Sequence, residues 1–185
     1  MAKFTGWKRR YSYLNDYKKG MDGKYVYYGR HYIFKGDSRE LTRYKWILGI
    51  TDVLLAALFV IGGLTDAGAI WNTWYVVAPF ALEVICIFLL IWKSVTLITE
   101  KVLVKEYIYK KTVPWFRPLL CILTAVCLLS VIAAVVCMLS LPDRVKQTGC
   151  ILYIVIKVLT AAVAVISLRL QQKNGWELDP SEEME

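Results

Sequence analysis

The chain lacks the residue patterns that mark most enzyme active sites and metal centres. It contains one histidine, His31, among 185 residues. No glycine-rich phosphate loop, no nucleophilic serine motif and no carboxylate group with metal-ligand spacing occurs in it. We therefore expect a non-enzymatic protein without a metal or a cofactor. His31 is interpreted as an interfacial side chain, since it lies among tyrosines.

Paired cysteines and glycosylation acceptors are also absent. No Cys-x-x-Cys motif occurs, which argues against a four-helix membrane thiol oxidoreductase, because such an enzyme needs paired cysteines near its outer face. No Asn-x-Ser/Thr sequence occurs either, which fits a bacterial membrane. The cysteines are interpreted as small, polarizable packing residues: Cys86, Cys121, Cys127, Cys137 and Cys150.

What the chain has in excess is apolar sequence, with 57% hydrophobic residues against about half in soluble domains. Each of four apolar runs is long enough to cross about 30 Å of hydrocarbon, which takes about 20 helical residues. The runs cover residues 44–64, 74–93, 118–141 and 150–170. The predicted fold class is an all-α membrane protein, a four-helix transmembrane bundle. A basic segment, 1–43, precedes the bundle (44–170), and an acidic tail, 171–185, follows it.

The distribution of charge predicts the orientation of these runs. Twelve of the 23 Lys and Arg residues precede Trp46, and a further cluster lies in the central loop, 94–117. The loop 65–73 has no Lys or Arg, and the loop 142–149 has two. By the positive-inside rule, both termini and the central loop lie in the cytoplasm of a cell-membrane protein. The net charge of +8 is then read as attraction to anionic lipid headgroups rather than to nucleic acid.

Three charges interrupt the apolar runs, and their depths predict which of them meet. Glu83 lies about nine residues, or about 13 Å, from the outer end of its run. Lys157 lies about seven residues, or about 10 Å, from the outer end of its own run. The sequence therefore predicts an intramembrane ion pair between them. Asp52 is an additional acid nearer the cytoplasm, and it would need Lys157 to reach inward or a partner such as Thr51, Thr160 or a bound water.

These buried charges leave two functions open. A charge in the bilayer centre costs at least about 2.5–3.5 kcal/mol, which pairing partly offsets. As structural glue, or as a contact for a partner's helix, the charges fit an accessory, assembly or scaffold subunit that binds a partner or the lipid surface. As a relay, they fit a small proton-coupled transporter or channel that uses Glu83, Asp52 and Lys157. A dry, closed pair would favour the first interpretation, and a water-accessible route past Glu83 the second.

The N-terminal segment is basic and rich in tyrosine. Gly29-Arg30 is flanked by aromatic and β-branched residues, which predicts a hairpin of Lys24–Tyr28 with His31–Lys35. We expect this segment to bind anionic headgroups, another membrane protein or a second copy of the chain. The expected surface-binding residues are Tyr25, Tyr27, Tyr28, Arg30 and Tyr32.

Other features mark the boundaries of the spans. Tryptophans are expected at the membrane interfaces: Trp46, Trp74, Trp92 and Trp115. Helical and strand periods both fit part of the segment 95–117, and the stretch from Pro114 to Pro118 is expected to end it and to anchor the third span. The third span carries no charge, so it is expected to face lipid or a dimer partner. The acidic tail is expected to be disordered.

Overall fold

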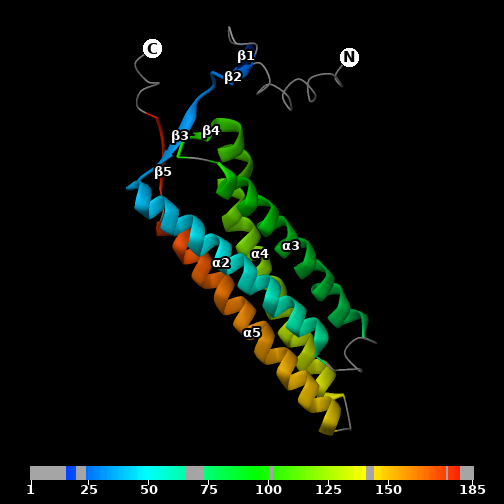
Figure 1. Ribbon diagram of the computed structural model, residues 1–185. Helices are drawn as coiled ribbons and strands as arrows, with labels where there is room; N and C mark the ends of the chain where they lie inside the picture. Colours follow the sequence, from blue (N-terminus) through cyan, green and yellow to red (C-terminus); the bar gives the residue numbers. More distant parts are fainter. Residues whose placement is uncertain are drawn as a thin grey trace, which may run out of the picture.

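The computed structural model describes residues 16–19, 24–65, 73–100, 102–140, 144–173 and 175–179. Across these residues, four long helices pack side by side as a bundle (Figure 1). They are α2 (Ser38–Leu64), α3 (Trp74–Thr99), α4 (Glu106–Leu139) and α5 (Arg144–Lys173). Each contains a stretch long and apolar enough to cross a membrane. The predicted class is confirmed: the chain is a multi-pass membrane protein.

α4 lies at the centre of the packing, against both α3 and α5. Its buried side includes Leu123, Cys127 and Ala134, none of which is exposed. The opposite side of α4 is exposed and includes Ile122, Leu129 and Ile132. The expectation that the third span faces lipid or a dimer partner therefore holds for one of its sides only. An uncharged helix can pack inside a bundle as readily as against lipid, because close contact between helices in lipid depends on small residues rather than on charge.

α4 also begins 12 residues earlier than predicted and continues through Pro114 and Pro118. Both prolines are exposed on the outside of the helix. There, carbonyl groups that lose their intrahelical partners to proline can bond to water or to headgroups. The prediction that these prolines end the central segment was therefore wrong. α3 likewise continues past the predicted end at residue 93, to Thr99.

Short strands gather at the end of the bundle where α2 and α4 begin and α3 and α5 end (Figure 1). β3 (His31–Phe34) is the centre of an antiparallel sheet, between β4 (Val104–Lys105) and β5 (Trp176–Leu178). β1 (Tyr17–Lys19) and β2 (Tyr25–Tyr27) form a separate antiparallel pair. We call β1 to β5, together with residues 28–30 that join β2 to β3, the head.

The strands of the head pair differently from the predicted hairpin. Strands do form at 25–27 and 31–34, but they do not pair with each other, since β2 pairs with β1 and β3 with β4 and β5. A two-stranded hairpin is marginal in water, whereas a three-stranded sheet that packs on a helix is not. Here Phe34 is 6% exposed and packs against the rings of Tyr44 and Trp176.

The strands of the head also correct the predictions for the tail and for the segment 95–117. In the tail, which was expected to be disordered, Trp176–Leu178 is a strand of the head. The segment 95–117 contains both of the structures that its sequence allowed: helix up to Thr99, a short strand, then helix from Glu106.

Tyr44 joins α2 to α5 directly beneath the head. Its hydroxyl donates to Gln171 Oε1 at 2.7 Å, and both side chains are buried. We expect Tyr44→Phe to lower the free energy of unfolding by about 1–3 kcal/mol, because it leaves a buried amide oxygen without its donor. Reversible unfolding in mixed micelles measures the change. Tyr28→Phe is the matched control, since Tyr28 is 65% exposed, and an equal loss in both variants would contradict the assignment.

Candidate functional site

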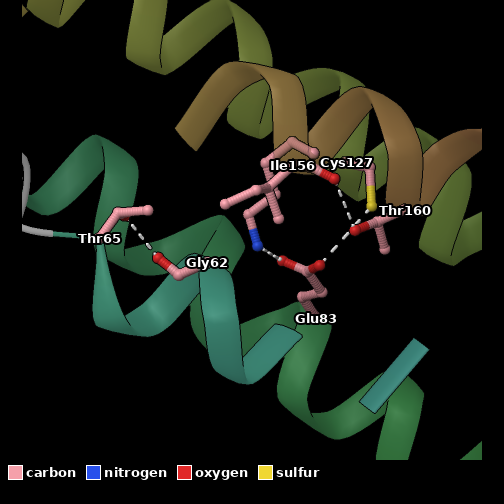
Figure 2. A network of polar contacts seen from close by, with 7 residues as sticks. Gly62, Thr65, Glu83, Cys127, Ile156 and Thr160 are labelled. Atoms are coloured by element: carbon pink, nitrogen blue, oxygen red, sulfur yellow. Dashed lines mark hydrogen bonds and ion pairs between the residues drawn. The ribbon is translucent and has the colours of Figure 1, made fainter. Parts of the chain in front are cut away.

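The predicted ion pair is present in the interior of the bundle (Figure 2). Glu83 extends from α3 and Lys157 from α5, and their Oε2 and Nζ atoms are 2.5 Å apart. Neither side chain has any exposed surface. The prediction from depth along the spans is therefore confirmed for this contact.

The pair is enclosed by groups from all four helices. Cys127 of α4 donates through Sγ to the other carboxylate oxygen, Glu83 Oε1, at 3.8 Å (Figure 2). The Lys157 ammonium also lies within cation–π distance of three aromatic rings. The distances from Nζ to the ring centres are 4.8 Å for Phe80, 5.0 Å for Tyr153 and 5.6 Å for Phe59. The ammonium is thus held by one carboxylate and by the faces of aromatic rings.

The backbone of α2 lies close to the pair at Gly62. A Cβ atom there would be in ordinary van der Waals contact with its neighbours, at 3.4 Å from Ile156 Cγ2 and 3.5 Å from Lys157 Nζ. The Gly62 carbonyl accepts a hydrogen bond from Thr65 Oγ1 at 2.7 Å, next to the pair (Figure 2). Thr160, which also lies nearby, donates to the carbonyl of Ile156 in its own helix at 2.9 Å. Neither threonine bonds directly to the two charges.

Two exposed tryptophans of α3 lie at equal distances along the helix on either side of Glu83. Trp74 and Trp92 are 81% and 59% exposed, and each lies nine residues from Glu83 along α3. At 1.5 Å per residue the two tryptophans are about 27 Å apart, close to the thickness of a hydrocarbon core. If they mark the two interfaces, as expected from sequence, Glu83 lies about 13 Å from each.

Asp52 does not join the pair. It is half-buried on α2 and faces the buried Ser94 hydroxyl of α3, nearer the head. Its expected protein partners are engaged elsewhere, since Thr51 and Thr160 each donate to a carbonyl of their own helix. Sequence reasoning missed Ser94, although a small polar residue near the end of an apolar run was a usable signal. Cys127 was treated only as a packing residue, and its contact with Glu83 was missed as well.

The expected surface-binding residues have different environments in the head. Tyr25 and Tyr28 are 71% and 65% exposed, and Arg30 is exposed as well. Tyr32 instead stacks on Tyr109, with ring centres 3.9 Å apart. Tyr27 packs against other rings at 5.2–5.8 Å, namely those of Tyr17, His31 and Tyr107. The first group can reach a partner, whereas the second holds the head together.

Metal-ligating residues do not gather in the part of the chain that the structure describes, where no group of three or more His, Cys, Asp or Glu residues converges. Cys137 and Cys150 pack with Val76, Ala134 and Tyr153 in an apolar cluster. Cys121 is exposed on α4. Among the described residues, the buried ion pair is therefore the strongest candidate for a functional site.

Comparison with known proteins adds no assignment. No protein family, curated protein or solved structure matches the chain. The function is therefore argued from the geometry of the pair and of the head.

Proposed function

We propose that the chain is a non-enzymatic accessory or scaffold subunit of the cell membrane. Its head lies in the cytoplasm and binds an anionic surface, either of a partner protein or of the lipid bilayer. The observation that carries this proposal is the closed Glu83–Lys157 pair, in which both side chains are fully buried. A bundle closed in this way supports the head rigidly and offers the two charges no contact with solvent.

The geometry of the pair supports a structural role. An ion pair deep in a membrane offsets part of the cost of burying each charge and fixes which helices lie side by side. The pair links α3 to α5, and Cys127 adds a contact from α4. Proton transport would instead need a chain of polar groups or waters that reaches Glu83. Asp52, the third residue of the transporter alternative, faces Ser94 rather than the pair.

The head supports binding to an anionic surface. Basic and aromatic side chains lie together on it, since the Lys18 ammonium lies 5.3 Å from the centre of the Tyr28 ring. Arg30 and Tyr25 are exposed nearby in the sequence. Rings provide apolar contact area with a polar edge, while the cations provide attraction that salt weakens.

Orientation can be tested by labelling. We expect a membrane-impermeant maleimide, applied from outside the cell, to reach a cysteine placed at Asn72 but not one placed at Lys110. The physical reason is that segments rich in Lys and Arg, such as the one around Lys110, are retained in the cytoplasm. The loop 65–73 has no Lys or Arg and can cross to the outside. The native cysteines are first replaced by alanine or serine, and permeabilised cells serve as the control. Labelling of Lys110→Cys alone in intact cells would contradict the orientation.

Binding by the head can be tested by photo-crosslinking in native membranes. A photoreactive phenylalanine at Tyr25 or Tyr28 is expected to crosslink a specific protein or anionic lipid, and Trp74, at the opposite end of α3, is the control position. Replacing both Lys18 and Arg30 with glutamate should then abolish the crosslinks from Tyr25 and Tyr28. Unchanged crosslinks after this charge reversal would contradict an electrostatic binding surface.

A further inference from the structure

A cleft of about 350 Å³ lies beneath the head, between the first turns of α2, the last turns of α5 and the end of β3. It is separate from the ion pair and is not used in the function proposed above. Its apolar lining includes Phe34, Leu48 and Leu170. Its charged lining consists of Lys35, Glu40 and Arg43. The cleft therefore has a charged rim, formed by Lys35, Glu40 and Arg43, and an apolar floor that includes Phe34, Leu48 and Leu170.

The cleft lies at the level where headgroups meet hydrocarbon. Trp46, 69% exposed on α2, lies within one turn of Arg43 and next to Ile47, which also lines the cleft. An exposed tryptophan at the end of an apolar span marks the membrane interface. Thr51, one turn beyond Ile47, lines the cleft deeper in the span. The charged residues thus face the headgroup region, and the cleft extends toward the acyl chains.

Of the charged residues at the rim, Arg43 is the one that favours a phosphate. Lys35 pairs with Glu177 of β5, whereas no ion pair holds Arg43 within the described ranges. A guanidinium can bind two phosphate oxygens at once, which gives geometric specificity as well as attraction. Glu40 would repel a second anionic group but can accept a hydrogen bond from a headgroup hydroxyl. A phosphate diester with a hydroxylated headgroup therefore fits both residues.

We propose that this cleft binds one anionic glycerophospholipid, with its phosphate at Arg43 and the first carbons of an acyl chain against Leu48 and Leu170. Basic pockets between transmembrane helices on the cytoplasmic side are suited to anionic headgroups. The inference rests on the proposed function in one respect, namely that this end of the bundle faces the cytoplasmic leaflet. The inference adds to the proposed function the class of lipid that is bound and one site that binds it. A bound lipid there would fill the space between α2 and α5 and brace the base of the head.

The test is native mass spectrometry of the full chain in detergent, titrated with phosphatidylglycerol or phosphatidylcholine that carries the same acyl chains. We expect one phosphatidylglycerol to bind about tenfold more tightly than phosphatidylcholine. Arg43→Gln should lower that affinity about tenfold. Arg117→Gln is the matched control, because Arg117 is an exposed arginine on α4 outside the cleft and also loses one charge. A second variant, Thr51→Phe, fills the deep end of the cleft and should reduce binding of both lipids.

Three results would overturn the proposal. The first is equal affinity for the two lipids, and the second is an equal effect of Arg43→Gln and Arg117→Gln. The third is displacement of the lipid by glycerol 3-phosphate at the lipid's own concentration, which would assign the site to a soluble phosphate. Arg43 is exposed, so its replacement is not expected to prevent folding. Crosslinking from Tyr25 and Tyr28 reports on the head, so failure of the lipid site and failure of the proposed function can be told apart.

Discussion

Replacing Glu83 with alanine is expected to lower the free energy of unfolding of the bundle by about 3–5 kcal/mol. The loss arises because Lys157, which has no exposed surface, would be left in the interior without a carboxylate, where it must either carry an unpaired charge or give up its proton. The aromatic rings around its ammonium do not replace the carboxylate, because they already contact the ammonium in the wild type. Unfolding in mixed micelles, followed by steric trapping or by helical circular dichroism, measures the change.

The double variant separates pairing from simple loss of packing. Glu83→Ala combined with Lys157→Met removes both charges and keeps most of the volume of the lysine. We expect it to recover at least about 2 kcal/mol relative to the sum of the two single variants. The control is the surface pair of Glu106 and Lys110, in which the Lys110 side chain is 65% exposed, and Glu106→Ala should cost about 0.5 kcal/mol or less. Additive effects of the Glu83 and Lys157 variants would show that the two residues do not act as partners.

Replacing Phe34 with alanine is expected to have the second largest effect, about 3 kcal/mol on the stability of the head. Phe34 is 6% exposed, and its ring lies 5.6 Å from that of Tyr44 and 5.4 Å from that of Trp176. It therefore connects the central strand both to α2 and to the C-terminal strand β5. Hydrogen exchange in lipid nanodiscs should show faster exchange at residues 31–34 and 176–178, with the helices unchanged.

Tyr28→Ala is the control for this prediction, because Tyr28 also belongs to the head but is 65% exposed. It should leave the exchange of β3 and β5 unchanged. If Phe34→Ala left the exchange of residues 176–178 unchanged as well, β5 would not depend on this aromatic cluster.

The bundle and its ion pair could be predicted because both follow from the positions of residues along the sequence. An apolar run of spanning length identifies a helix, and the position of a charge within the run gives its depth. Glu83 and Lys157 lie at similar depths, and the structure joins them. Asp52 lies at a different depth, and the structure keeps it apart from them. Depth alone was therefore sufficient to choose the partners.

The head could not be predicted in the same way, because its strands pair across long separations in the sequence. Tyr32 pairs with Val104 on one side and with Leu178 on the other. No local pattern specifies such partners, whereas the Gly29-Arg30 turn gave a local signal for the wrong hairpin. The path of α4 through Pro114 was missed for a related reason. Whether a proline ends a helix depends on what its surroundings offer to the freed carbonyl group.

The closed state of the pair is the central claim, and proton flux through the purified chain in liposomes tests it most directly. Liposomes loaded with a pH-sensitive dye are held at a membrane potential, and acidification of the lumen is followed with and without the protein. Because Glu83 and Lys157 have no exposed surface, we expect flux no greater than through protein-free liposomes, in the wild type and in Glu83→Gln alike. Flux above that level which Glu83→Gln abolishes would contradict a structural pair and would establish a proton path through the bundle.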